Sequence, residues 1–273
     1  MAHNIKVQLG TVQETLVLPL WGRAVESVKA QPKLVDTKAM EIVQQLDYDF
    51  SLITKNMSWV TQLAWVARSL HIDRAIRNFI TQYPAATIVN IGCGLDTTFE
   101  RNDNGRIIFY ELDLPDVMEL RKNFFPENER RRLITGSFLD TGWFQQLQGN
   151  KDVLMIAAGV FYYFSEQQIK EFILSAIQGL HGGEFFFDAA SPLGVKMANK
   201  KVIQGGGMDE TATLQWGLES ADTIERWDPC IKVLEEFPMF HGFKKGYSLK
   251  MKYGLWMSDV LNIMSMIHLK IVR

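Results

Sequence analysis

Cysteine and proline are both scarce in this sequence. Its 273 residues include two cysteines, Cys93 and Cys230, and eight prolines. Two cysteines cannot build the disulfide framework of a small secreted domain, so we expect a reducing, cytoplasmic location. Residues 1–10 lack the charged start and apolar core of a signal peptide. The longest apolar run, residues 153–164, is shorter than the roughly 20 residues that span a bilayer.

A marked excess of charge of one sign is also lacking. The formal net charge is -2, which gives no electrostatic case for nucleic acid or a membrane as partner. The arginine run 130–132 has no interleaved aromatic residues and is typical of a solvated helix end. No group of His and Cys has metal-ligand spacing, so we predict no metal. The expected partner is a small-molecule substrate. The apolar stretch 16–21 could pack over the site or across a homodimer interface.

The chain is long and apolar enough, at 47% hydrophobic residues, for one large core. We predict a single domain with four parts. These are a helical N-terminal extension (1–84), a cofactor-binding core (85–190), a lid insertion (191–230) and the C-terminal end of the sheet (231–273).

Strand and helix patterns alternate within the predicted core. Short apolar strands are predicted at 87–91, 106–112, 132–137, 152–157 and 183–188, with helices at 115–123 and 166–180 between them. This alternation predicts a parallel, doubly wound α/β sheet with helices on both faces and right-handed crossovers. Outside the core, helices are predicted at 11–28, 63–83 and 252–264, and strands at 231–237 and 266–272.

A glycine turn follows the first strand, in the string IVNIGCGLD at 88–96. Gly92 and Gly94 allow a sharp turn and a close approach of backbone to a ligand, and the following helix start offers free amides. Thr97 stands where the dinucleotide fingerprint has its third glycine. This favours S-adenosylmethionine, which has no pyrophosphate, over a nicotinamide cofactor.

Acidic residues follow the next two strands. Asp113 lies 21 residues after Gly92, where a carboxylate can accept hydrogen bonds from both ribose hydroxyls of an adenosine. Asp140 follows the third strand and could accept the adenine amino group or cap the helix that starts at Thr141. Phe138 or Leu139 would then contact the adenine ring.

Five strings in the sequence resemble the leucine carboxyl methyltransferase family: LPLWGRA at 18–24, VNIGCGLDT at 89–97, ELDLP at 111–115, GVFYYF at 159–164 and WDP at 227–229. The resemblance extends from about residue 15 to the end. It is closer to the bacterial branch, the tetracenomycin-type O-methyltransferases of polyketide biosynthesis.

This resemblance implies a class I methyltransferase fold, with seven strands of which the last is antiparallel, and S-adenosylmethionine as methyl donor. It also implies site residues: Arg68 and Arg23 at the cofactor carboxylate, Gly92 and Gly94 under the cofactor, Asp113 and Leu114 at the ribose, and Phe138, Leu139 and Asp140 at the adenine. Ala158 is placed at the cofactor as well. Because phosphatase-methylating members have a glutamate at that position, Ala158 favours the small-molecule branch.

Methyl transfer from a sulfonium is an in-line displacement that depends mainly on positioning. A carboxylate acceptor needs no base, whereas a hydroxyl acceptor would benefit from one. Candidate bases are Tyr162, Tyr163, His241, His181 and Asp188, each with a structural alternative, so no single catalytic residue is predicted.

The predicted C-terminal insertions are rich in large apolar side chains. They include Trp216, Trp227, Met197, Met208 and Phe240, which could form a lid suited to a hydrophobic acceptor or could simply pack in the core. We therefore expect an O-methyltransferase acting on a small, hydrophobic, polyketide-like molecule. The alternatives are a nicotinamide-dependent oxidoreductase and a non-catalytic, cofactor-binding regulator.

Overall fold

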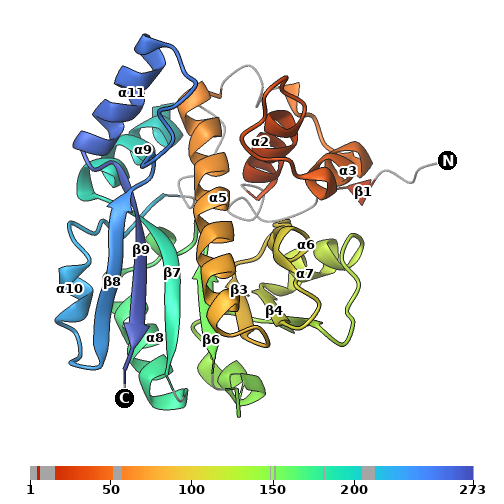
Figure 1. Cartoon of the computed structure of the whole chain (residues 1–273), viewed down its shortest axis with the longest axis vertical. Coiled ribbons are helices and arrows are strands. Elements are labelled where there is room, and N and C mark those ends of the chain that lie inside the picture. The colour runs from red at the N-terminus through yellow and green to blue at the C-terminus, as the bar shows by residue number, and fades with distance from the viewer. Residues whose placement is uncertain are drawn as a thin grey trace.

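A seven-stranded sheet runs through the molecule (Figure 1). The computed structural model describes residues 5–6, 16–51, 57–147, 149–150, 152–180, 182–204 and 213–272. The strands are β3 (Thr87–Ile91), β4 (Ile108–Asp113), β5 (Arg131–Thr135), β6 (Val153–Ala157), β7 (Gly183–Ala190), β8 (Ile231–Pro238) and β9 (Met264–Ile271), in the order β5-β4-β3-β6-β7-β9-β8. Strands β3 to β7 are parallel, and β9 is antiparallel to both β7 and β8. The predicted doubly wound sheet with an antiparallel last strand is confirmed.

The strand order reverses between β3 and β6. From β3 the chain adds β4 and β5 on one side, and then crosses to add β6 and β7 on the other. At such a switch point the connections leave a crevice outside the carboxyl ends of the strands. Ile91 pairs with Leu112 on one side and with Ala157 on the other, so the chain segments that follow these three residues start side by side.

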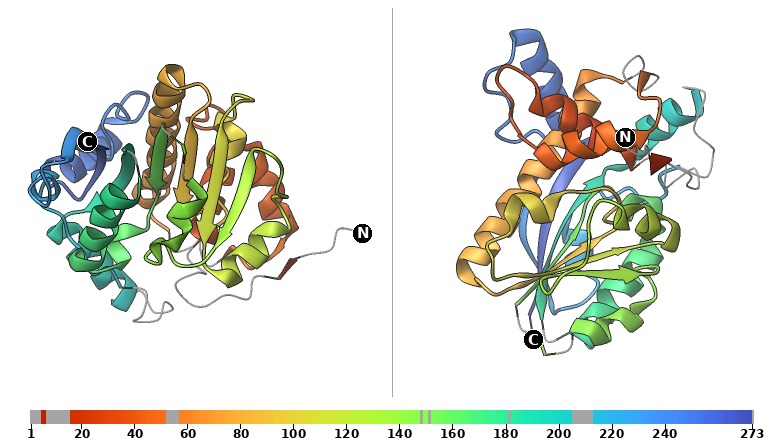
Figure 2. Two further views of the ribbon diagram at one scale, coloured as in Figure 1. Left: turned by 90° about the horizontal axis from the view of Figure 1, so that it is seen from below. Right: turned by 90° about the vertical axis from the view of Figure 1, so that its right-hand side faces the viewer.

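Helices cover both faces of the sheet (Figure 2). Alternate residues of each strand point to opposite faces, so Ile88 and Phe109 pack toward α5 (Trp59–Gln82). Their neighbours Val89 and Tyr110 pack toward α8 (Glu166–Gly179) and the 3-10 helix η1 (Thr141–Leu147). Because both faces are covered, every residue of β3 and β6 is buried.

The N-terminal helices α2 (Val17–Ser27) and α3 (Thr37–Gln45) pack beyond the ends of β3 and β4 (Figure 1). Of the helix predicted at 11–28, residues 11–15 lie outside the described part. The helix predicted from 63 starts earlier, at Trp59, because the Ser58 side chain caps it by accepting from the Thr61 amide. The two-residue strands β1 (Ile5–Lys6) and β2 (Leu46–Asp47) pair with each other.

Some boundaries differ from the prediction for local reasons. Strand β4 starts at Ile108 rather than 106, because the Asn104 side-chain oxygen accepts hydrogen bonds from the amides of Arg106 and Ile107, which are then not available to a neighbouring strand. Helix α11 (Leu249–Val260) starts behind its Ser248 cap and ends before Asn262, whose positive φ of 46° stops a helix.

Four further α-helices are described, of which α6 and α10 are the shortest. They are α6 (Thr98–Asn102), α7 (Pro115–Lys122), α9 (Pro192–Gln204) and α10 (Asp222–Glu225). Helix α9 occupies the start of the predicted lid insertion, whose glycine run 205–207 lies outside the described residues. None of the helices described here is long and apolar enough to cross a membrane.

Candidate active site

The glycine turn at the end of β3 is enclosed on two sides. Gly92 and Gly94 have positive φ angles of 62° and 46°. A Cβ on Gly92 would lie 2.5 Å from a methyl group of Val160, and one on Gly94 would lie 3.2 Å from the Cβ of Leu16. Both positions therefore require glycine for conformation and for space. The turn is held between the loop after β6 and the start of the N-terminal helices.

Asp113, the predicted ribose acid, is fixed against this turn. Its two carboxylate oxygens accept hydrogen bonds from the amides of Gly94 (2.7 Å) and Leu114 (2.8 Å). Burial raises the pKa of Asp113, against the lowering effect of those two bonds. A carboxylate offers about four acceptor positions, so two remain for a pair of ribose hydroxyls.

Arg121, which the sequence analysis missed, holds the turn from the opposite side. Its side chain is completely buried, pairs with the equally buried Glu111, and donates to the carbonyls of Gly94 (2.7 Å) and Asp96 (2.9 Å). Glu111 was the available signal, because it is a charged residue inside the apolar strand 108–113. Buried charges are almost always paired, so a basic partner for Glu111 could have been expected.

A second polar cluster lies at the ends of β6 and β7. Arg68 on α5 donates from Nη1 to Asp188 (3.0 Å) and to the Tyr162 hydroxyl (3.3 Å). The other oxygen of Asp188 accepts from the Gly159 amide at 2.6 Å. Gly159 has a positive φ of 76°, and a Cβ there would lie 2.5 Å from Arg68 Nη1. One carboxylate thus orients both the arginine and the turn after β6.

The charge state of this cluster limits its chemistry. Burial alone would lower the pKa of Arg68, but its interactions with Asp188 and Tyr162 together outweigh that effect and raise it, so the guanidinium stays charged. Burial raises the pKa of Tyr162 well above its ordinary value, so the phenol stays protonated near neutral pH and cannot accept a proton. Among the described residues, both hydrogen bonds of Arg68 use Nη1. Its other nitrogens are therefore available to an anionic ligand.

The predicted adenine contacts differ in exposure. Phe138 is buried, with Phe161, Phe164 and Phe172 at ring distances of 4.8 to 5.6 Å, so its ring belongs to the core. Leu139 is half-buried and Asp140 is exposed at the start of η1, without a capping bond to that helix. Ala158 is half-buried directly after β6. The roles predicted for these residues stay predictions.

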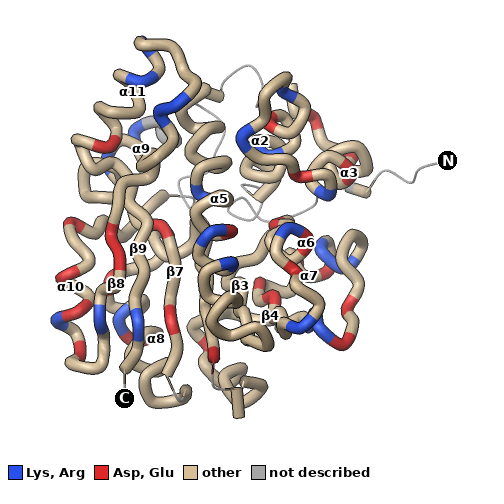
Figure 3. Tube along the Cα trace, in the orientation of Figure 1, with Lys and Arg blue, Asp and Glu red and all other residues tan. Residues whose placement is uncertain are grey.

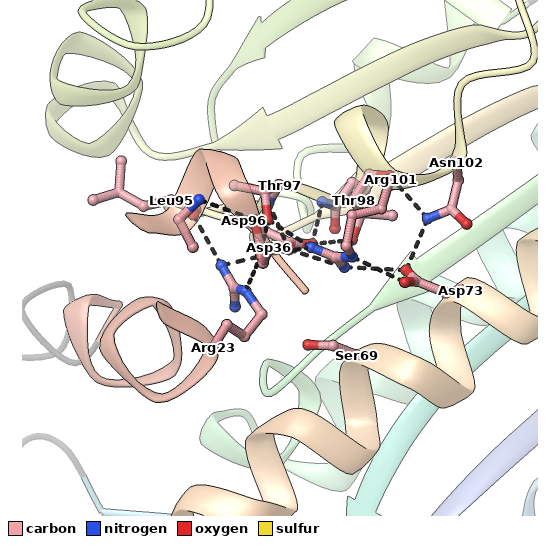
Figure 4. A network of polar contacts seen from close by, with 12 residues as sticks. Arg23, Asp36, Ser69, Asp73, Leu95, Asp96, Thr97, Thr98, Arg101 and Asn102 are labelled. Carbon is pink, nitrogen blue, oxygen red and sulfur yellow. Dashed lines mark hydrogen bonds and ion pairs between the residues drawn. The ribbon is translucent and has the colours of Figure 1, made fainter. Parts of the chain in front are cut away.

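Arg23 lies in a buried ionic network beside the glycine turn (Figure 4). It donates to Asp36 (2.9 Å) and to the Leu95 carbonyl (3.2 Å). The same oxygen of Asp36 also accepts from Thr97 and Arg101. These contacts make Arg23 part of the support of the turn, and its predicted contact with the cofactor carboxylate stays a prediction.

The network continues from Arg101 to Asp73 on α5 and to Asn102 on α6 (Figure 4). Burial would raise the pKa of Asp96, but the guanidinium groups of Arg23 and Arg101 lower it to about 2. Asp96 therefore stays ionised at neutral pH. The network as a whole ties α2, α3, α5 and α6 to the glycine turn.

Replacing Asp36 with asparagine is expected to lower the free energy of unfolding by about 3 kcal/mol, because two buried arginines lose a shared counter-ion. The asparagine oxygen can still accept from the Ala39 amide and cap α3, so the loss of stability comes from the missing charge. Urea unfolding measures the free energy of unfolding. Glu41→Gln, in the exposed pair with Lys38, is the control and should change stability by less than about 1 kcal/mol. Equal losses in both variants would contradict the role of the network.

His241 does not join the other candidate bases. It lies on an exposed turn after β8, and β6, β7 and β9 separate that strand from β3. At about 4.8 Å per strand, β8 lies roughly 19 Å from β3 and roughly 10 Å from β7, the strand that carries Asp188. Tyr163 does stay at the crevice, with its ring 5.0 Å from that of Tyr162. His181 lies outside the described residues.

Some of the predicted lid residues lie near the loop after β6, and others lie elsewhere in the molecule. Gln215 and Trp216 donate their amides to the Tyr162 carbonyl, so this segment lies across the loop after β6. Trp216 is buried with its ring 6.1 Å from that of Trp227, whereas Met197 on α9 is exposed. Phe240 packs in the core on the α5 side, and Met208 lies outside the described residues. The part of the chain that the structure describes contains no cluster of potential metal ligands.

A doubly wound sheet with this strand order, a glycine turn and an acid at its switch point defines a class I S-adenosylmethionine-dependent methyltransferase. Among solved structures, magnesium protoporphyrin IX methyltransferase from Synechocystis PCC 6803 with bound S-adenosylmethionine matches with a TM-score of 0.50 and 9% identity, over 89% of this chain and 100% of that one. A methyltransferase from Anabaena variabilis matches with a TM-score of 0.50 and 13% identity, over 74% and 85%. These likenesses concern the fold.

The profile of the leucine carboxyl methyltransferase family matches residues 17–177. The chain is 30% identical over 238 residues to the tetracenomycin polyketide synthesis O-methyltransferase TcmP of Streptomyces glaucescens, covering 85% of each. It is 24% identical over 283 residues to the S-adenosyl-L-methionine-dependent methyltransferase dpfgK of Gibberella zeae, covering 94% and 93%. The chain belongs to the leucine carboxyl methyltransferase family, and its cofactor is S-adenosylmethionine. The nicotinamide alternative has no support.

Proposed function

We propose that this enzyme transfers the methyl group to an oxygen, either a carboxylate or a hydroxyl, of a small hydrophobic molecule of polyketide type. The similarity to TcmP over 85% of the chain supports this acceptor class. So does Ala158, because the phosphatase-methylating members carry a glutamate at this position.

The observation that carries the proposal is the pair of polar anchors on either side of Gly92. Asp113 is fixed against the turn after β3, and Arg68 is fixed at the ends of β6 and β7. The residues fit S-adenosylmethionine, since Asp113 would hold its ribose and Arg68 its carboxylate. When bound, the cofactor supplies an electrophilic methyl group on its sulfonium.

The surroundings of these anchors suit an acceptor that needs little help from a base. The two tyrosines and the segment at 215–216 lie at the ends of β6 and β7, and Tyr162 has a raised pKa. His241 is distant. Positioning and exclusion of water are then the main contributions of the protein. A carboxylate or an acidic phenol, which ionises by itself, is the acceptor that this arrangement favours.

Calorimetric titration with S-adenosylhomocysteine tests the cofactor site. We expect micromolar binding by the wild type and a loss of roughly a hundredfold in Asp113→Ala, because two hydrogen bonds to a charged group disappear. Asp116→Ala, in the first turn of α7, removes a nearby carboxylate and is the matched control. Equal affinity in all three proteins would contradict the assignment of Asp113.

An acceptor screen with isotopically labelled S-adenosylmethionine tests the reaction. A labelled product that releases methanol in mild alkali is a methyl ester and identifies a carboxylate acceptor, whereas a stable product is an ether. Methylation on nitrogen or carbon would contradict the proposal. Cofactor binding without turnover on any acceptor would instead fit the non-catalytic regulator.

A further inference from the structure

Helix α11 exposes an apolar face to solvent. Leu249, Tyr253, Trp256 and Val260 are exposed by 84%, 62%, 47% and 59%. At 3.6 residues per turn these four residues fall within an arc of about 60°, so they form one stripe along the helix. Leu255, on the opposite side, is completely buried. The helix therefore packs against the molecule with one apolar face and turns a second one outward.

The stripe lies in a basic part of the chain. From 240 to 258 the sequence has four lysines, Lys244, Lys245, Lys250 and Lys252, and no acidic residue. At 100° per residue, Lys250 lies on one side of the stripe and Lys252 on the other. The next acid, Asp259, is itself buried and paired with Lys244 at 2.9 Å. The net charge of the whole chain, -2, conceals this local concentration of positive charge.

The position of α11 also matters. The helix connects β8 to β9, and Pro238 at the end of β8 pairs with Ser265, while Ala190 at the end of β7 pairs with Met264. Helix α11 thus lies at the edge of the sheet where the parallel strands end, the same edge as the cofactor crevice. It forms one extremity of the molecule (Figure 1), and Figure 3 shows its basic residues there.

We propose that α11 docks the protein on an anionic lipid surface. A helix with Trp, Tyr and Leu on one side and flanking lysines has the composition of helices that lie in the headgroup region of a bilayer. The stripe would enter the interface, and the lysines would meet anionic headgroups. Since the crevice opens at the same edge, docking would bring it close to the apolar phase.

The charge pattern favours this occupant over a second copy of the chain. In a two-fold symmetric contact the patch meets itself. Here that contact would oppose lysine-rich surfaces with no exposed acid between 240 and 258 to neutralise them. An anionic lipid surface supplies the missing charge over an extended area.

Sedimentation with phosphatidylcholine vesicles, with and without phosphatidylglycerol, tests the proposal. We expect the wild type to bind only the vesicles that contain phosphatidylglycerol, and to bind them less in high salt. The double variants Leu249→Ser/Trp256→Ser and Lys250→Ala/Lys252→Ala should each bind roughly tenfold less or weaker still. The matched control is Leu234→Ser/Lys232→Ala on β8, which removes an exposed leucine and a lysine elsewhere and should bind like the wild type.

Three results would overturn the proposal. The first is that the wild type binds neither vesicle, and the second is that both α11 variants bind as well as the wild type. The third is that light scattering finds a wild-type dimer that Leu249→Ser/Trp256→Ser converts to a monomer, because a second copy of the chain would then cover the stripe. S-adenosylhomocysteine titration of every variant shows that the proteins are folded. It also separates this proposal from the proposed methyl transfer, which does not depend on it.

Discussion

Asp188→Asn is expected to destabilise the ligand-free enzyme by about 3 kcal/mol, and S-adenosylhomocysteine should restore part of that loss. The substitution leaves the buried Arg68 guanidinium without its counter-ion, and the amide nitrogen of asparagine would face one of the two donors, Arg68 or the Gly159 amide, in place of an acceptor oxygen. A ligand carboxylate at Arg68 would replace the missing charge. Thermal unfolding with and without ligand measures both effects.

A ligand that lacks the amino-acid part provides the decisive comparison. 5′-Methylthioadenosine keeps the adenine and ribose but has no carboxylate, so it should stabilise Asp188→Asn no more than it stabilises the wild type. S-adenosylhomocysteine should stabilise the variant more than the wild type. Asp152→Asn, at an exposed position, is the control for removing a carboxylate. If both ligands stabilised variant and wild type alike, Arg68 would not be the anchor of the cofactor carboxylate.

Arg121→Met is expected to lower the free energy of unfolding by about 4 kcal/mol, which is a large part of the stability of a typical domain. Glu111 would lose its closest counter-ion in a fully buried position, and among the described residues Arg131, at 3.6 Å, would be the one cation left within pairing distance. The carbonyls of Gly94 and Asp96 would also lose their donor. We expect a lower urea midpoint at an unchanged m-value, together with weaker binding of S-adenosylhomocysteine.

Two further variants separate charge from packing at this position. Arg130→Met breaks an exposed pair with Asp103 and should change stability by less than about 1 kcal/mol. Arg121→Met/Glu111→Gln should recover much of the loss, because it removes the uncompensated acid as well. If Arg121→Met proved as mild as Arg130→Met, the buried pair would not be what holds the cofactor turn.

Local sequence patterns were enough to predict the core of this fold. The apolar strands follow from short-range periodicity, and the glycine turn and Asp113 were found from their places at the ends of two of those strands. The boundaries were less predictable, because single side chains set them. Asn104 delays the start of β4, and Asn262 stops α11.

The polar interior could not be predicted in the same way. Arg68 and Asp188 are 120 residues apart, and Asp36 meets Arg101 from 65 residues away, so only the folded chain reveals these pairs. Asp188 was considered as a base, whereas its two hydrogen bonds give it an orienting position. The position of His241 was also beyond local patterns. Strand β9 lies between β7 and β8, so the end of β8, which His241 follows, is one strand further from the crevice than the chain order suggests.

Because two arginines share Asp36, the buried network restricts how this enzyme can change over evolution. The Asp36 carboxylate joins Arg23 and Arg101, and Arg101 also depends on Asp73. A substitution at any one of these positions removes at least one partner of a buried charge, so we expect such changes to survive mainly in matched combinations. The exposed residues of α11, such as Leu249, can by contrast be exchanged one at a time without leaving a buried charge unpaired. The ionic support of the glycine turn is thus constrained as a group, while the stability of the fold leaves the exposed face of α11 free to diversify.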